Sequence, residues 1–279
     1  MMGLANRLRA ITSCQALARH LGLDFAMRWE PGEGFSDERW QDLFANPVAR
    51  LDADAWAAAR EGDAVDLGPW LGWGDDRPPA PDFEPARALD EIRARGLVWQ
   101  RGFHNVDKLL ARRDVPGLGR VRRLRHRACR ALRPAAPLAR RVDAFCDAHF
   151  RDRRVLGVHV RRGDALDSPR AESHLRSSDE AFAAEMERAA GADPALHFFL
   201  ATDCEKTLAG FRERFGERVL ALDKPFVPSV LGAPKPGQAD AAVDLFLLSR
   251  TEAVLGTYAS TFGRMGAHMG GLRFRTAGD

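Results

Sequence analysis

The second half of the chain alternates between short apolar runs and amphipathic segments, beginning at Val155. This rhythm is typical of a parallel sheet whose strands are joined by crossover helices. We expect strands near residues 154–160, 196–201, 218–222, 252–256 and 272–275. Helices fit between them near residues 178–190, 204–215, 239–250 and 260–269. The pattern therefore predicts an α/β fold with a Rossmann-like second half.

The first 150 residues have a less regular pattern. Apolar residues recur at helical spacing over about 6–21, and a strand is expected over 24–29. Gly3 turns directly into that helix, so either the start is assigned too late or the first domain lacks its first strand. Because 279 residues suit two modest cores, we expect two domains, 1–150 and 151–279.

The composition is that of a soluble globular protein, with 45% apolar and 29% charged residues. The formal net charge of +3 tolerates an anionic ligand without indicating nucleic acid. Heavy use of Arg, Ala, Gly and Pro indicates a GC-rich bacterial genome. The four cysteines are widely spaced and lack metal-ligand spacing, so we expect reduced thiols. Without an apolar run of about 18 residues or a signal-peptide core, cytoplasmic is the default location.

The strand predicted at 154–160 ends abruptly in Arg161, Arg162, Gly163 and Asp164. Adjacent arginines point in different directions, so one guanidinium can face a cleft while the other holds the loop. Arginine binds phosphate through two parallel hydrogen bonds and stays charged at any relevant pH. The plainer alternative is a surface turn closed by an Arg–Asp pair.

Two later segments of the chain contain further residues that are candidates for binding a ligand. The helix expected near 239–250 holds Asp244 just before a strongly apolar patch, where a lone aspartate is usually solvated. The segment 253–263 reads as a strand, a glycine, and then Ser260 and Thr261 opening a helix. These hydroxyl residues either simply cap the helix or help form an anion site at its positive end.

Together with the turn near the start, these segments resemble the GDP-fucose-dependent fucosyltransferases that share an H-x-R-R-G-D type motif. That group includes α1,6, α1,2, nodulation and protein O-fucosyltransferases. The resemblance covers the first helix and most of the second half, whereas residues from about 30 to 150 match nothing. The matching stretches are 3–10, His159 to Asp164, Phe199 to Asp203, and Asp244 to Phe262.

The resemblance implies a GT-B-like fold, in which two Rossmann-like domains face a cleft. The first domain would be smaller, irregular and on the acceptor side, and the second would bind the nucleotide sugar. It implies that the donor is GDP-fucose, that no cofactor or metal is needed, and that the acceptor is a glycan or related hydroxyl compound. The residues it places on the donor are His159, Arg161, Arg162, Asp203, Asp244 (on guanine), Ser260, Thr261 and Phe262, with Asn6 and Arg7 from the first domain.

The expected chemistry is an inverting displacement in which negative charge grows on the leaving diphosphate. Preorganised cations and amide groups stabilise such charge, which makes Arg161 the expected catalytic residue. The letters of a metal-binding D-x-D occur at Asp52 and Asp54, but they precede a helix and are expected to cap it. His104 or Asp107 is a candidate general base, although an ordinary loop explains both.

Residues 118–141 contain nine arginines and no acidic residue, with apolar residues spaced along one helical face. The segment suits a solvated helix face, a peripheral contact with an anionic membrane surface or an anionic acceptor, or docking on nucleic acid. No aromatic residue lies among the arginines, which argues against single-stranded RNA. The alternatives to a fucosyltransferase are an inactive GDP-sugar-binding protein, an enzyme for another nucleotide sugar, and a protein that binds anionic surfaces.

Overall fold

The computed structural model describes residues 3–29, 38–61, 65–66, 85–95, 98–99, 117–162, 175–228, 234–235 and 237–279. The chain divides into an N-terminal unit, Met1–Glu30 with Asn46–Ala131, and a C-terminal unit, Pro31–Ala45 with Leu132–Asp279. This division differs from the expected boundary after residue 150. The C-terminal unit begins earlier in the sequence and also includes a segment from the first half of the chain.

A five-stranded parallel sheet forms the centre of the C-terminal unit. Its spatial order is β11-β10-β5-β6-β7, so the sequence order reverses direction between β5 and β10. All five strands expected from the apolar runs are confirmed. Their bounds are β5 (Val155–Val160), β6 (His197–Thr202), β7 (Val219–Leu220), β10 (Ala253–Gly256) and β11 (Arg273–Thr276).

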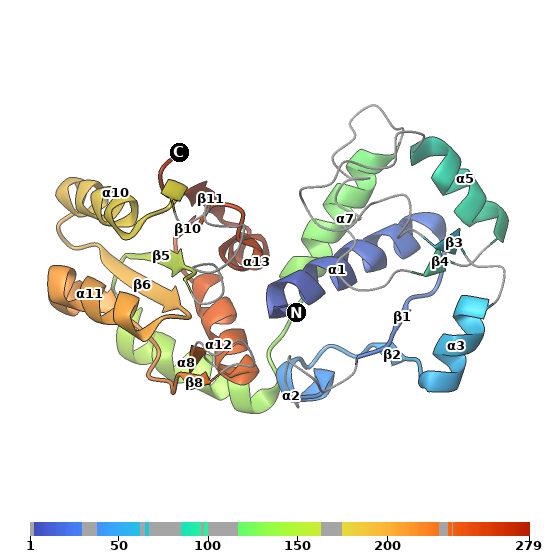
Figure 1. Cartoon of the computed structure of the whole chain (residues 1–279), viewed down its shortest axis with the longest axis horizontal. Helices are drawn as coiled ribbons and strands as arrows, with labels where there is room; N and C mark the ends of the chain where they lie inside the picture. Colours follow the sequence, from blue (N-terminus) through green and yellow to red (C-terminus); the bar gives the residue numbers. More distant parts are fainter. Residues whose placement is uncertain are drawn as a thin grey trace. The chain divides into compact units, whose positions relative to one another are not determined.

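Helices cover both faces of this sheet (Figure 1). On one face, Phe182 of α10 and Phe211 of α11 pack with Val158 and Phe198 of the strands. On the other face, Phe145 of α8 contacts Phe199 edge-on, with 5.5 Å between ring centroids, and α12 and α13 complete the layer. The bounds are α8 (Ala136–His149), α10 (Asp179–Ala192), α11 (Glu205–Phe215), α12 (Gln238–Leu248) and α13 (Thr261–Gly270).

Helix α12 explains the strongly apolar patch in the sequence, because every residue from Ala242 to Leu248 is buried. One side of it contacts the sheet layer, and another contacts the short helix α2 (Trp40–Leu43), where the rings of Phe44 and Phe246 lie 6.0 Å apart. The remaining elements of this unit are the 3₁₀ helix η1 (Gly216–Arg218) and the antiparallel pair β8 (Val227–Pro228) and β9 (Pro234–Lys235).

In the N-terminal unit, α1 (Leu4–Leu21) packs along α7 (Leu118–Arg130), burying Leu8, Val121 and Leu124. This confirms the helix and the apolar helical face expected from the sequence. Parallel pairs join β1 (Ala26–Met27) to β2 (Ala49–Arg50), and β3 (Val65–Asp66) to β4 (Val98–Trp99). The other helices are α3 (Ala53–Glu61) and α5 (Pro85–Arg95).

The letters of the D-x-D motif serve as a helix start, as expected. The Asp52 carboxylate accepts a hydrogen bond from the backbone N–H of Ala55 at 2.8 Å, at the first turn of α3. A carboxylate in this position satisfies a free helical donor and complements the helix dipole. The capping prediction is therefore confirmed.

Candidate functional site

The carboxyl ends of β5 and β10 meet where the strand order of the sheet reverses. Thr257, just after β10, donates from its backbone N–H and its hydroxyl to the carbonyl of His159, both at 3.1 Å. Its hydroxyl also accepts from the backbone N–H of Arg161 at 2.9 Å. In open α/β sheets, ligands bind outside the carboxyl ends of the strands at this kind of reversal.

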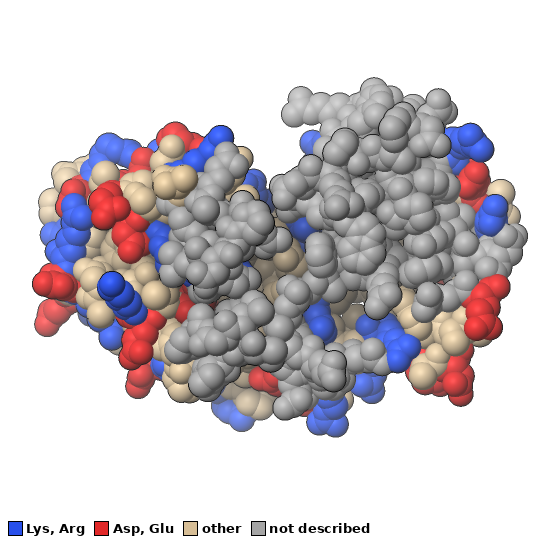
Figure 2. All heavy atoms as spheres, in the orientation of Figure 1, with Lys and Arg blue, Asp and Glu red and all other residues tan. Residues whose placement is uncertain are grey.

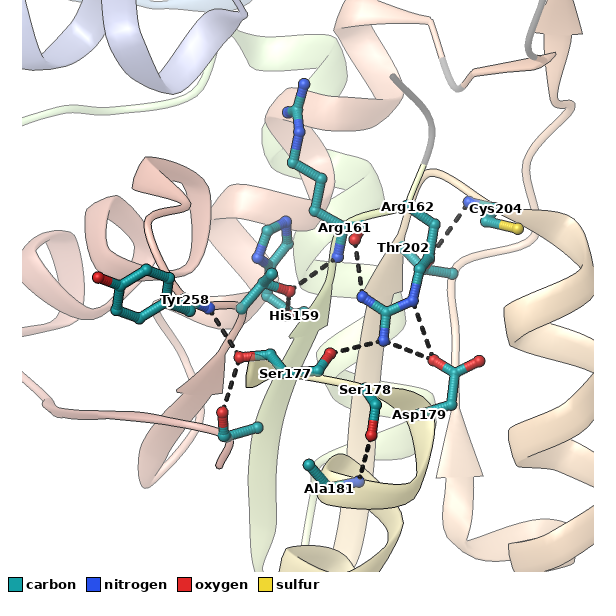
Figure 3. A network of polar contacts seen from close by, with 12 residues as sticks. His159, Arg161, Arg162, Ser177, Ser178, Asp179, Ala181, Thr202, Cys204 and Tyr258 are labelled. Carbon is teal, nitrogen blue, oxygen red and sulfur yellow. Dashed lines mark hydrogen bonds and ion pairs between the residues drawn. The ribbon is translucent and has the colours of Figure 1, made fainter. Parts of the chain in front are cut away.

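Arg162 is held inside the protein, with only 7% of its surface exposed. Its guanidinium donates to the Asp179 carboxylate at 2.6 and 3.1 Å, to the carbonyl of Ser177 at 2.8 Å, and to that of Arg161 at 2.8 Å (Figure 3). Its backbone N–H donates to Asp203 Oδ1 at 2.7 Å. Arg162 therefore fixes the backbone of the motif.

Arg161 has a different environment from its neighbour. Figure 3 shows its side chain extending away from the polar network that holds Arg162, and the residue is partly exposed. Arg162 thus holds the loop, as one of the two arginines was expected to do, while the Arg161 side chain points away from the network around Arg162. Gly163 and Asp164, which complete the motif, lie outside the described residues.

The turn between β10 and α13 is tightly constrained. Ala259 adopts a left-handed φ of 55°, which costs energy for a residue with a side chain. The Ser177 hydroxyl accepts from the backbone N–H of Tyr258 at 2.9 Å and donates to the carbonyl of Ala277 at 2.7 Å. Ser177 therefore links this turn to the segment that follows β11.

The amino-terminal turn of α13 begins at Ser260, whose backbone N–H donates to the Thr257 carbonyl at 3.1 Å. The Ser260 side chain makes no capping hydrogen bond. The first N–H groups of a helix have no partner within the helix, and the helix dipole is positive at this end. Through Thr257, this turn and the backbone of Arg161 belong to one edge of the sheet, so both can serve one anion site.

The ring of His159 is buried against the same turn. It stacks on Phe262 with 4.9 Å between centroids and 23° between planes. A Cβ added to Gly263 would lie 3.1 Å from the Cβ of His159, so glycine allows this close approach. Burial lowers the pKa of His159 from 6.5 to about 3, and the charges of Arg161, Lys224 and Arg162 act in the same direction. The imidazole is therefore neutral at physiological pH.

Asp244 forms a buried ion pair with Lys224, a residue that sequence reasoning did not single out. The two side chains are only 4% and 2% exposed, respectively. Burial raises the pKa of Asp244, while the charge and hydrogen bond of Lys224 oppose this effect. Asp244 is thus not the solvated aspartate that its helical position alone would suggest.

Asp203, Asn6 and Arg7 were also expected to contact the donor sugar nucleotide. Asp203 follows β6 and holds the Arg162 backbone, whereas Asn6 and Arg7 lie in the first turns of α1, in the N-terminal unit. The guanidinium carbon of Arg7 lies 4.9 Å from the ring centre of Trp29. The two candidate bases, His104 and Asp107, lie outside the described residues.

Sequence reasoning also missed Ser177 and Asp179, which hold Arg162. Their only signal was a position at a predicted helix start, where Ser178 caps α10 by accepting from Ala181 N–H at 3.1 Å. Within the described ranges, no group of three or more His, Cys, Asp or Glu side chains is arranged to hold a metal ion. None of the helices in the described part of the chain has the length and apolar character needed to span a bilayer.

Comparison with solved structures shows which proteins share the fold of this chain. The sequence matches no family model and no curated protein, but many solved structures share its fold. NodZ α-1,6-fucosyltransferase soaked with GDP-fucose aligns with 96% of this chain and 89% of its own, at 20% identity and a TM-score of 0.57. The chain shares the fold of this fucosyltransferase.

Two further structures support this assignment. POFUT1 in complex with GDP-fucose covers 100% of this chain and 96% of its own, at 12% identity and a TM-score of 0.58. A mutant of Arabidopsis thaliana FUT1 in complex with GDP covers 99% and 68%, at 13% identity and a TM-score of 0.57. The expected α/β class and GT-B type are therefore confirmed.

Proposed function

We propose that this protein is an inverting, metal-independent glycosyltransferase that transfers fucose from GDP-fucose to a hydroxyl group of a glycan or related acceptor. The observation that carries this proposal is the junction at Thr257. This residue joins the backbone of Arg161 to the amino-terminal turn of α13 at the reversal point of the sheet. A guanidinium and a row of helical N–H groups at one edge suit a diphosphate.

The proposed reaction is a single displacement at the sugar's anomeric carbon. The acceptor oxygen forms a bond to that carbon while the bond to the β-phosphate oxygen breaks, and GDP leaves with the bonding electrons. The acceptor's proton passes to a general base, for which His104 and Asp107 stay candidates. Asn6 and Arg7 stay the proposed donor contacts of the N-terminal unit. We propose this unit as the acceptor-side domain and the C-terminal unit as the nucleotide-sugar domain.

Arg161 carries the largest proposed catalytic effect. Negative charge accumulates on the diphosphate as the glycosidic bond breaks, and a positioned cation stabilises that charge without reorganising in the reaction. Arg162 contributes indirectly, because it holds the carbonyl of Arg161. The helix turn of Ser260, Thr261 and Phe262 supplies amide groups for the same phosphates.

The nucleoside end is proposed to lie against His159 and Asp244, both buried in the same unit. A neutral imidazole stacked on Phe262 offers a flat, partly apolar surface beside the phosphate-binding turn. A buried carboxylate accepts hydrogen bonds from the N–H groups of a guanine edge, which adenine and uracil do not present in the same arrangement.

Turnover of labelled GDP-fucose with purified protein tests the proposal. Calorimetry with GDP comes first, followed by release of fucose to water and then a screen of glycan and lipid-linked acceptors. We expect GDP binding and transfer to at least one hydroxyl acceptor. Binding without turnover would favour the alternative of an inactive GDP-sugar-binding protein, and the absence of GDP binding would rule out both.

A second proposal concerns the location of the protein, because α7 presents a row of exposed arginines. Arg120, Arg123, Arg127 and Arg130 recur along one side of the helix, while its apolar side packs on α1. In contrast, blue and red side chains are interspersed over α10 and α11 in Figure 2. We propose that α7 makes a peripheral contact with the anionic inner face of the cytoplasmic membrane.

A further inference from the structure

Lys224 and Asp244 form the most deeply buried ion pair among the described residues. One oxygen of the Asp244 carboxylate has no hydrogen-bond donor in this pair. Lys224 contacts only Oδ2 of the carboxylate, while Oδ1 is buried and accepts no hydrogen bond from any described residue. A buried acceptor without a donor is unfavourable, because it has lost its hydrogen bonds to water and gained none in the protein. An ion pair that served stability alone would be expected to satisfy both oxygens.

The imidazole of His159 is a second buried group with an unused polar atom. Nδ1 of His159 is buried, and no described residue hydrogen-bonds to it. Lys224 lies close enough to His159 for its charge to contribute to the lowered pKa of the imidazole. Lys224 therefore stands near two buried groups, each of which has an unused polar atom. Buried polar atoms are usually paired, so the unused Oδ1 beside Lys224 and the unused Nδ1 of His159 are both suited to hydrogen-bond a polar ligand.

The other charges around Asp244 have their own partners. Asp240, on the same helix, pairs with Arg141 of α8 at 2.6 Å. Arg162, whose charge acts on His159, pairs with Asp179. Lys224 follows β7 at the carboxyl edge of the sheet, and its ammonium lies 5.9 Å from the centre of the Phe226 ring. Among these cations, only Lys224 directly contacts Asp244.

We propose that Lys224 is a base-reading residue, which holds Asp244 in place in the empty site and donates to O6 of guanine in the filled one. The inference rests on the proposed function and specifies how the base is selected. On the guanine edge, O6, N1–H and the N2 amino group follow one another. Lys224, Oδ2 and Oδ1 have the matching order of donor, acceptor, acceptor.

In this arrangement, each polar atom of the guanine edge has a hydrogen-bond partner on Lys224 or Asp244. Oδ2, already in contact with Lys224, accepts from N1–H, and the unused Oδ1 accepts from the N2 amino group. The lysine moves from sharing Oδ2 to bridging Oδ2 and O6. Adenine presents an amino group where guanine has O6 and would oppose its donor to the ammonium.

The first experiment compares ligands on the unchanged protein by calorimetry. Inosine diphosphate lacks only the N2 amino group, so Oδ1 stays unsatisfied and its affinity should be about 10-fold to 100-fold below that of GDP. ADP should bind more weakly still. Equal binding of GDP, inosine diphosphate and ADP would overturn the inference while leaving a phosphate site intact. Failure to bind both GDP and pyrophosphate would instead overturn the proposed function, and the inference with it.

The second experiment separates base reading from structural support. Lys224→Met should lower GDP affinity at least about 30-fold, while affinity for inorganic pyrophosphate changes less than about twofold, because pyrophosphate carries no base. Lys206→Met, an exposed lysine on α11, should change neither. Equal losses for GDP and pyrophosphate would show a structural role and contradict the inference.

A paired variant covers the case in which Lys224→Met leaves a buried charge and unfolds. Combining Lys224→Met with Asp244→Asn replaces the ion pair by two neutral groups, a change that proteins often tolerate. The double variant should again lose GDP selectively over pyrophosphate. Unchanged GDP affinity in either variant would exclude Lys224 from base reading.

Discussion

The rings of His159 and Phe262 stack 4.9 Å apart, joining the end of β5 to the first turn of α13. This contact places a residue of the arginine motif directly against the proposed phosphate-binding turn. Burial lowers the pKa of this imidazole, and the charges of Arg161, Lys224 and Arg162 lower it further. A histidine in this environment resists protonation, which has a measurable consequence for stability.

Acid should destabilise the protein through His159. Its pKa is about 3 in the folded state and near 6.5 when exposed, so the unfolded chain binds the extra proton between these values. Stability therefore falls as pH decreases through 6.5, by up to about 1.4 kcal/mol per pH unit. Urea unfolding of the wild type and His159→Gln at several pH values checks this. The variant should show the shallower decline, and identical slopes would contradict the prediction.

Replacing Gly263 should disturb binding more than stability. Gly263→Ala adds a methyl group 3.1 Å from the Cβ of His159 and must displace the stacked ring. We expect GDP affinity to fall about tenfold, while the helical preference for alanine offsets part of the strain, with a net change within about 1 kcal/mol. Gly210→Ala on α11, where the added Cβ meets nothing within 4 Å, is the control and should leave binding unchanged.

Removing the guanidinium of Arg161 should abolish most turnover without unfolding the protein. Arg161→Ala should lose about 3 kcal/mol of transition-state stabilisation, or about 100-fold to 1,000-fold in kcat. Arg161→Lys keeps the positive charge but loses the two parallel N–H donors of the guanidinium, so it should recover only part of this loss. Arg212→Ala, an exposed arginine on α11, should behave as wild type. Full activity in Arg161→Ala would remove this residue from the site.

Asp179 should affect turnover through Arg162. Asp179→Asn weakens the two hydrogen bonds that hold the guanidinium, so Arg162 supports the Arg161 carbonyl less firmly. We expect a loss of about 1–2 kcal/mol in unfolding free energy and a lower kcat with GDP affinity less affected. Glu213→Gln on α11 is the exposed control. An unchanged kcat would limit Asp179 to a stabilising role.

Charge on α7 should control membrane binding. Vesicle sedimentation with about 30% phosphatidylserine should retain the wild type, and Arg123→Gln with Arg127→Gln should weaken retention about tenfold or more. Arg212→Gln with Arg273→Gln removes the same charge from the C-terminal unit and should have little effect. Retention should decrease with salt, because exposed charges are screened. Equal losses in both variants would indicate a nonspecific effect of net charge.

The sequence predicted the sheet because its strands are buried on both faces and therefore read as apolar runs, as Leu200 and Val254 illustrate. It did not predict the unit boundary, since Phe44 joins the C-terminal unit through a long-range contact with Phe246 that leaves no local pattern. Lys224 was missed for the same reason. Its partner Asp244 lies 20 residues away, and only folding brings the two together.

The hydroxyl of Ser177 makes the proposed phosphate-binding turn depend on a distant part of the chain. By bridging Tyr258 and Ala277, it ties the strained corner at Ala259 to the segment after β11. A protein shortened before Ala277, or one carrying a bulky fusion at this point, would lose that anchorage. The turn at Ala259 would then be free to relax, and the proposed donor binding would weaken although every motif residue remained in place.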